Sequence, residues 1–272
     1  CNNCGLIQMS PRPSEEGMDQ FYRFQYWREF KNPEGNVDKQ RRRARDILGD
    51  LKSHLYSIKN KNPLILEIGS GWGVTLKKIG LTLEKINKNP RLYFIEPNFD
   101  ATNSMSDNLY ALGKHYQDLK KTNIKFDLII MSQVLEHFFN PMEAIEIVKK
   151  HLAPEGLFYV AVPDFYRHFS YSIYHNICFT EQTIASMFNR ANFSVSIITQ
   201  KENGKFIKLI ARHKTDEFII SANQIWINPL GKASISPLPW NHKQLPFWAG
   251  VHSPYDVNFF YGRSLIDILI SF

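Results

Sequence analysis

The sequence predicts an α/β fold built on a mostly parallel β-sheet with helices on both faces. Short apolar runs rich in β-branched residues alternate with segments of helical periodicity, which is typical of strands joined by crossover helices. One of these runs ends in an acid followed by a glycine at every second position, which predicts a sharp strand-to-helix turn. Further along, Asn203-Gly204 between two β-rich runs predicts an antiparallel hairpin at the end of the sheet.

The glycine-rich turn follows the first predicted strand, residues 64–68, and precedes a helix over 74–83. Glycine lacks a Cβ and tolerates positive φ, so main-chain N–H groups in such a turn can face a ligand at the start of the helix. A dinucleotide-binding fingerprint would need its third glycine at Val74, so that motif does not fit.

The other elements follow in chain order from the same patterns. An amphipathic helix is predicted over 38–57, with apolar residues at helical spacing. Strand 91–96 ends in an acid, and Pro141 can begin a helix after the strand at 126–132. The remaining predictions are helices over 100–112, 141–151 and 180–190, a turn at 152–156, and strands over 157–162, 193–199 and 205–212.

Two motifs resemble one enzyme family. The spacing Glu67, Gly69, Gly71, Gly73 resembles the first motif of the class I S-adenosylmethionine-dependent methyltransferases, and the resemblance extends over residues 64–213. The Leu-Glu-His-x-x-x-Pro pattern within 135–141 is similar to the small-molecule subgroup. No Asn-Pro-Pro-Tyr motif, as used by amino-group methyltransferases of nucleic acids and proteins, is present. The resemblance implies a Rossmann-like, seven-stranded methyltransferase sheet with a terminal antiparallel hairpin.

The resemblance also implies S-adenosylmethionine as the cofactor. Glu67 would lie near its amino-acid end, and the glycines would make room for it. Glu96, at the tip of the second strand, can accept strong hydrogen bonds from two ribose hydroxyls. Asp118 falls where the family often contacts the adenine amino group, and a surface aspartate is the alternative. The predicted cofactor-binding set is Glu67, Gly69, Ser70, Gly71, Gly73, Glu96, Asp118, Ser132 and Gln133.

The catalytic prediction rests on where the fourth strand ends. Ligands of open α/β sheets bind outside the carboxyl ends of the strands, which places Glu136 and His137 beside the first motif. Since an unperturbed imidazole titrates near pH ~6.5, His137 is predicted as the general base and Glu136 as its orienter or a second acid–base group. The alternative is that His137 only shapes the site.

The predicted reaction is methyl transfer to a small polar acceptor, plausibly a sugar or sugar nucleotide. The formal charge of +7, from 33 Lys and Arg against 26 Asp and Glu, favours an anionic acceptor. Part of that charge is the cluster Lys39, Arg41, Arg42, Arg43 and Arg45, which indicates a solvated helix face. RNA methylation is an alternative without a recognised RNA-binding module, so nucleic acid is an unlikely partner. A non-catalytic cofactor-binding or truncated relic protein is the alternative from a different class.

The N-terminal segment, residues 1–37, is predicted to precede the methyltransferase domain at 38–213. Cys1 and Cys4 resemble half of a small zinc ribbon found before the catalytic domain in some sugar-modifying methyltransferases, and two ordinary reduced cysteines are the alternative. Zinc needs four ligands and Cys178 stands alone, so no metal site is predicted. Aromatic and cationic residues over 21–28 cover the core or, alternatively, form a lid over a substrate pocket.

The C-terminal segment, residues 214–272, is rich in proline and aromatic residues. It is predicted to be an ordered extension whose end, 257–270, begins a truncated second α/β lobe. A chain that starts at Cys1 is expected to be a fragment or a processed product. No apolar run approaches the ~20 residues of a membrane span, so a cytoplasmic location is expected.

Overall fold

The computed structural model describes residues 5–25, 33–97, 109–167, 175–198 and 204–214. All of them belong to the first of two units, Cys1–Ile219. The second unit, Ile220–Phe272, lies outside the described residues, as do the predicted C-terminal extension and second lobe.

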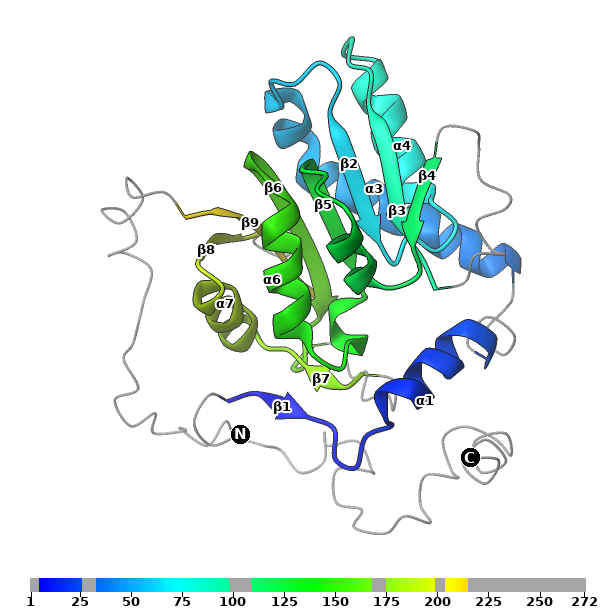
Figure 1. Ribbon diagram of the computed structural model, residues 1–272, viewed down its shortest axis with the longest axis vertical. Helices are drawn as coiled ribbons and strands as arrows, with labels where there is room; N and C mark the ends of the chain where they lie inside the picture. Colours follow the sequence, from blue (N-terminus) through cyan, green and yellow to red (C-terminus); the bar gives the residue numbers. More distant parts are fainter. Residues whose placement is uncertain (1–4, 26–32, 98–108, 168–174, 199–203, 215–272) are drawn as a thin grey trace. The chain divides into compact units, whose positions relative to one another are not determined.

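A seven-stranded sheet forms the centre of the described unit, in the order β4-β3-β2-β5-β6-β9-β8 (Figure 1). Neighbouring strands from β4 to β6 pair in parallel, whereas β9 pairs antiparallel with both β6 and β8. The predicted fold class is therefore confirmed, including the terminal hairpin. The strands are β2 (Leu64–Ile68), β3 (Arg91–Ile95), β4 (Leu109–Gly113), β5 (Phe126–Ser132), β6 (Leu152–Pro163), β8 (Phe193–Ile197) and β9 (Phe206–His213).

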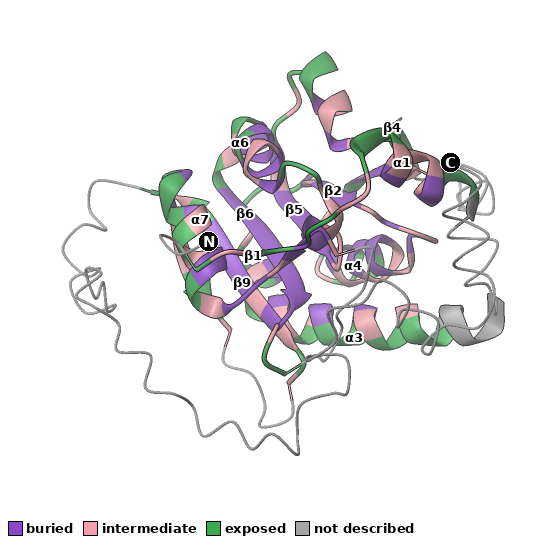
Figure 2. Ribbon diagram, turned by 90° about the horizontal axis from the view of Figure 1, so that it is seen from below, coloured by how far each residue is buried: buried purple, intermediate pink, exposed green. Residues whose placement is uncertain are grey.

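Helices cover both faces of the sheet, α3 (Pro33–Ser57) and α4 (Val74–Glu84) on one and α6 (Pro141–His151) and α7 (Glu181–Arg190) on the other (Figure 1). Adjacent strand residues alternate between the two cores: Ile65 packs with the α3/α4 layer and Leu66 with the α6/α7 layer. In Figure 2 the central strands are buried, while α3 carries buried, intermediate and exposed residues in turn. None of the helices in the described ranges combines the length and apolarity needed to span a bilayer.

The register of the central strands fixes where the loops meet. Ile68, the last residue of β2, pairs with Ile95 of β3 on one side and Met131 of β5 on the other. Because all three strands run in the same direction, the residues that follow them emerge at one edge of the sheet. The glycine turn, Glu96 and Gln133 are thereby brought together.

A buried polar contact anchors α3 on the sheet. The fully buried Tyr159 of β6 donates a hydrogen bond to Asp50 of α3 at 2.8 Å, and Lys208 of β9 pairs with the same carboxylate at 2.8 Å. This contact holds in place the helix that contributes Gln40 and Arg43 to the site described below.

Two local predictions were wrong. The end of the helix predicted over 100–112 is strand β4, because Leu109 and Tyr110 pair with Leu92 and Tyr93 at the sheet edge; residues 98–108 lie outside the described residues. Pairing with a neighbouring strand thus overrides local helical preference. The turn predicted at 152–156 is a bulge inside β6, where the register with β5 jumps.

The N-terminal segment docks at the carboxyl edge of the sheet. Its short strand β1 (Ile7–Gln8) pairs antiparallel with β7 (Ile177–Cys178), and the helices α1 (Glu15–Gln20) and η1 (Phe21–Gln25) follow. In Figure 1, α1 lies beyond the arrowheads of the central strands. Residues 21–25 of the aromatic segment predicted over 21–28 therefore lie at the carboxyl edge of the sheet. Residues 26–28 lie outside the described residues.

Candidate functional site

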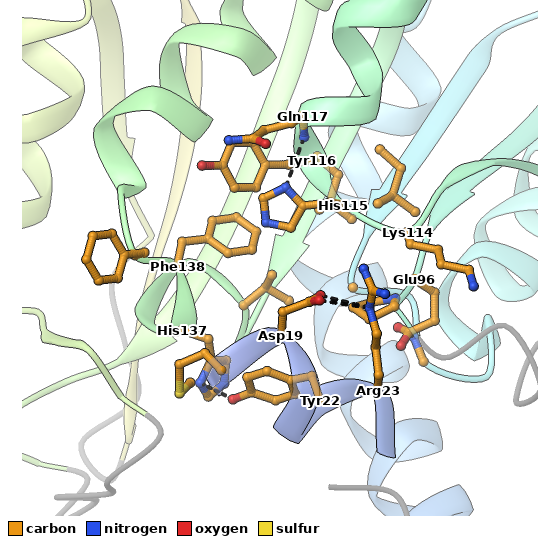
Figure 3. Close-up of a pocket in the computed structure, with 18 of the residues that line it drawn as sticks. Asp19, Tyr22, Arg23, Glu96, Lys114, His115, Tyr116, Gln117, His137 and Phe138 are labelled. Atoms are coloured by element: carbon orange, nitrogen blue, oxygen red, sulfur yellow. Dashed lines mark hydrogen bonds and ion pairs between the residues drawn. The ribbon is translucent and has the colours of Figure 1, made fainter. Parts of the chain in front are cut away.

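A cavity of about 700 Å³ opens at the carboxyl edge of the sheet. The glycine turn, the ends of β3 and β5, the start of α3 and the N-terminal helices α1 and η1 all contribute to its lining. In the view of Figure 3, His137 and Tyr22 lie toward one side and Glu96 and Lys114 toward the other. Its volume falls within the range of cofactor and small-molecule sites, ~300 to 1,000 Å³.

The turn after β2 has no room for a side chain at two of its positions. Gly69 and Gly71 have φ of +72° and +54°, in the region that favours glycine. A Cβ at Gly69 would collide with the side chain of Val134, and one at Gly71 would lie 2.9 Å from Nε2 of Gln40. The backbone of the turn therefore forms one wall of the cavity directly.

Glu96 and the turn are joined by a hydrogen bond. The N–H of Gly71 donates to Oε2 of Glu96 at 2.8 Å, and the N–H of Gly69 donates to the carbonyl of Ile95 at 2.8 Å. Glu96 is 5% exposed and lines the cavity. A buried carboxylate that accepts from a backbone N–H is held in one orientation, and carboxylates are strong acceptors for hydroxyl donors.

Glu67, the acid before the turn, sits behind the wall rather than in it. Thr75 and the N–H of Leu76 hydrogen-bond its carboxyl group, so it caps the start of α4, where Gly73 at the N-cap has no side chain to do so. Burial raises the pKa of Glu67 to about 8, and the Thr75 hydrogen bond opposes that shift. Among the described atoms, its Oε2 has no hydrogen-bond partner.

Helix α3 contributes two polar side chains to the cavity. Gln40 accepts a hydrogen bond from the N–H of Trp72, and Arg43 donates to Oε1 of Gln133, whose φ is +57°. Sequence analysis grouped Arg43 with a solvated cationic face. Its cluster neighbours Lys39, Arg41, Arg42 and Arg45 are exposed and lie outside the lining of this cavity, whereas Arg43 is half-buried and lines it.

An aromatic wall follows β4. The ring of His115 lies 4.2 Å from that of Tyr116, and Tyr116 lies 4.6 Å from Phe138, measured between centroids. Burial lowers the pKa of His115, and its Nδ1 accepts a hydrogen bond from the N–H of Gln117, so its neutral form is favoured. Flat apolar and weakly polar surfaces of this kind suit a heterocyclic base.

Asp118 supports the backbone of this aromatic wall and is not itself part of the cavity lining. Its Oδ2 accepts from the N–H groups of Lys114 and His115 at 2.8 and 3.0 Å, and its Oδ1 pairs with Lys121 at 2.6 Å. The described lining includes Lys114, His115 and Gln117 but not Asp118. In this geometry the carboxylate orients the loop that lines the cavity.

The opposite side of the cavity holds His137. Its Nδ1 lies 2.7 Å from the hydroxyl of Tyr22, and its Nε2 lies 3.8 Å from Oε1 of Glu136. The ring of His175 packs against it with a centroid separation of 4.9 Å. The backbone carbonyl of His137 accepts from Nδ2 of the buried Asn176 at 2.8 Å. Two distant parts of the chain thus meet at His137: Tyr22 and His175 contact its ring, and Asn176 holds its backbone.

Glu136 is buried beside His137 and is 1% exposed. Neither carboxylate oxygen has a hydrogen-bond partner of normal geometry among the described residues, although the N–H groups of Glu136 and Val134 lie near enough to favour the charge slightly. Burial raises the pKa of Glu136 to about 8. A buried acid without hydrogen bonds is costly, so its retention here requires a functional explanation.

The predicted site residues therefore divide by position. Those that line the cavity are Gly69, Gly71, Glu96, Gln133 and His137. Those outside the described lining are Glu67, Ser70, Gly73, Asp118, Ser132 and Glu136. Sequence reasoning did not assign Asp19, Gln40 or His115 to the site, and it treated Tyr22 and Arg23 only as members of a core or lid segment.

The comparison with protein families agrees with this geometry. A family model described as a methyltransferase domain matches residues 38–196, more than half of the chain. The chain belongs to this methyltransferase domain family. The family predicted from the sequence motifs is thereby confirmed, while the sugar-specific subgroup, the zinc ribbon and the domain boundaries remain predictions.

Comparison with solved structures agrees with the fold through the first of two matches. An O-methyltransferase family protein from Burkholderia thailandensis matches with a TM-score of 0.51 at 11% identity, over 72% of this chain and 64% of that one. The CurJ carbon methyltransferase matches with a TM-score of 0.47 at 14% identity, over 58% and 50%. The chain thus spans less than two thirds of the length of either protein. No curated protein sequence matches it significantly.

Replacing Glu67 with Gln should remove a pH dependence of stability. The carboxyl keeps its proton up to about pH 8 in the folded protein, whereas its unperturbed pKa is 4.5. Between these values the unfolded chain binds fewer protons, so the free energy of unfolding falls as pH rises. Relative to the parent, Glu67→Gln should be about equally stable near pH ~5 and roughly 1 to 4 kcal/mol more stable near pH ~8.5.

Urea unfolding of both proteins at a series of pH values measures this difference. Glu136 is present in both, so its own titration largely cancels in the comparison. A difference that stays constant across the series would show that Glu67 does not keep its proton in the folded state.

Proposed function

We propose that this protein transfers the methyl group of S-adenosylmethionine to a small polar acceptor. The observation that carries the proposal is the hydrogen bond between the glycine turn and Glu96 at the rim of the cavity. It places a side-chain-free backbone wall and a buried carboxylate beside each other, as one nucleoside site requires.

The residues present fit this cofactor. Gly69 and Gly71 line the cavity with backbone alone, and the buried carboxylate of Glu96 beside them is an acceptor suited to ribose hydroxyls. The aromatic wall after β4 offers a surface for the adenine, next to Gln117. When bound, the cofactor supplies a methyl group already activated on a sulfonium, so the protein has to align a nucleophile with it and manage a proton.

His137 is the group we assign to the acceptor's proton. It lines the cavity on the side opposite Glu96, and its Nε2 faces the buried carboxyl of Glu136. Tyr22 holds the other ring nitrogen, so the imidazole presents Nε2 in a fixed direction. Glu136 then acts as the second acid–base group behind it.

The acceptor is proposed to be a sugar or sugar nucleotide. Support comes from the sequence resemblance, from the net charge of +7, and from the polar lining that α1 and η1 add to the cavity. Asp19 and Arg23 pair there at 2.9 Å, and Glu15 and Glu16 lie beside them. Paired charges and carboxylates of this kind hydrogen-bond hydroxyl-rich molecules.

Replacing Glu96 with Ala should weaken S-adenosylmethionine binding by about tenfold or more, because one or two charge-assisted hydrogen bonds are lost at roughly 1.5 to 3 kcal/mol each. Glu96→Gln keeps an acceptor for the N–H of Gly71 and should lose less affinity. Calorimetric titration measures both, with the exposed Glu84→Ala as the control. Unchanged affinity in Glu96→Ala would remove this carboxylate from the cofactor site.

Replacing His137 with Ala should lower turnover by about a hundredfold or more, while cofactor affinity stays within about twofold. The acceptor is first found by a mass-spectrometric screen of cell metabolites for methylated products. His54→Ala, which removes a histidine of α3 that contacts Arg212 of β9 and lies outside the cavity lining, is the control for loss of an imidazole. If His137→Ala kept its turnover, or lost cofactor binding in proportion to activity, positioning alone would remain as the mechanism.

A further inference from the structure

Three side chains that the sequence separates widely meet beside the cavity. Glu136, His137 and His175 each offer a ligand atom, and these atoms all lie within 4.8 Å of one another. We propose that they bind one divalent transition-metal ion, of the class that takes nitrogen and oxygen ligands, with zinc as the reference ion. Two imidazoles and one carboxylate are a common ligand set for zinc sites that keep an open position.

The first argument is the state of Glu136. Its carboxyl group is almost completely buried, and neither oxygen has a normal hydrogen-bond partner among the described residues. Burying an ionised carboxylate is expensive unless a charge or a metal compensates it. A cation held between Glu136 and the two histidines supplies that compensation, which the hydrogen bonds of the described protein do not.

The second argument is the orientation of His137. A histidine that binds a metal through one ring nitrogen usually donates its other N–H to an oxygen, which fixes the tautomer and the ring. The hydroxyl oxygen of Tyr22 lies 2.7 Å from Nδ1 and can accept that hydrogen bond. We assign Nε2 as the ligand atom, because it is the nitrogen that faces Glu136 at 3.8 Å.

The third argument is the way His175 is brought to the site. The next residue, Asn176, is fully buried and donates to the backbone carbonyl of His137 at 2.8 Å. The carbonyl of Asn176 in turn accepts from the N–H of Met9 at 3.1 Å, next to the β1–β7 pairing. The side chain of Asn176 and the backbone pairing beside it therefore hold the two histidines together independently of the histidine side chains.

The distances leave only a small adjustment for the side chains. Ligand atoms about 2.0 to 2.2 Å from a tetrahedral zinc ion lie about 3.3 Å from one another. The observed separations are up to 4.8 Å. Rotation of the side chains would shorten them to the value for a bound ion. His137 lines the cavity, so a fourth position on the ion would face the space that we assign to the acceptor.

This inference rests on the proposed function for its role, although metal binding itself does not. In the loaded protein Nε2 of His137 shares its lone pair with the ion and is no longer a free base. A bound acceptor hydroxyl would then lose its proton to solvent more easily. Its oxygen would bond to the methyl carbon as the carbon–sulfur bond breaks, with the electron pair remaining on sulfur.

The test uses the full chain with Cys1→Ser and Cys4→Ser, because those thiols could bind zinc themselves. After dialysis against a chelator, the protein is titrated calorimetrically with Zn²⁺, and Co²⁺ is added in a parallel optical experiment. We expect one ion per chain with a dissociation constant below about 1 μM. The Co²⁺ spectrum should show visible bands without the sulfur charge-transfer bands of thiolate ligation.

Variants then identify the ligands. Glu136→Gln and His175→Ala should each weaken Zn²⁺ binding by about a hundredfold, and Tyr22→Phe, which loses only the second contact of His137, by about tenfold. His54→Ala is the matched control and should bind like the parent. Glu136→Gln has nearly the shape of the native side chain, so it remains informative if His175→Ala fails to fold.

Zn²⁺ binding that is absent, weaker than about 1 μM, or unchanged in both Glu136→Gln and His175→Ala would overturn the proposal. S-adenosylmethionine binding is measured on the same samples. If the parent binds Zn²⁺ but does not bind S-adenosylmethionine, the proposed function is wrong and the metal site is supported. If the parent binds S-adenosylmethionine but does not bind Zn²⁺, only the metal site is wrong.

Discussion

The site depends on the parallel alignment of β2 and β3, which lets the N–H of Gly71 donate to the carboxylate of Glu96. This one hydrogen bond ties the backbone turn after one strand to the acid after the next. It requires a left-handed turn without side chains, a parallel neighbour in register, and an acid at the tip of that neighbour. Since a change in any of these would separate the two groups, the geometry of the cavity follows from strand pairing rather than from the loops alone.

Two buried glutamates at the same edge of the sheet show how position decides the use of one residue type. Burial raises the pKa of both to about 8. Glu67 forms hydrogen bonds with Thr75 and with the start of α4, so its main effect is on local structure. Glu136 has no comparable partner in the described protein and lies beside His137, so it stays available for chemistry or for a cation. The two glutamates therefore differ in role because their hydrogen-bond partners differ, and not because their pKa values differ.

Local patterns in the sequence were sufficient for the sheet apart from its edge strand β4, and for one side of the cavity. Glycine spacing and an acid at a strand end are short-range signals, so Gly69, Gly71 and Glu96 could be placed before the structure was known. The pairing of β4 could not be predicted in this way, because an edge strand is stabilised by pairing with its neighbour rather than by the local preference of its own sequence. Nor could the meeting of His137 with Tyr22 and His175, since each comes from a different part of the chain and their contact is decided by tertiary docking.

The N-terminal segment gives the two sides of the cavity different origins. The side that we assign to the cofactor is made by strand ends that belong to the core of the sheet. The other side is made largely by α1 and η1, which a two-residue strand pairing and the contacts around Asn176 attach to it. Sequence drift in residues 15–23 therefore leaves the sheet and the nucleoside wall intact. If the proposed assignment holds, acceptor choice can diversify in evolution through this one short segment while the half of the cavity assigned to the methyl donor is inherited unchanged.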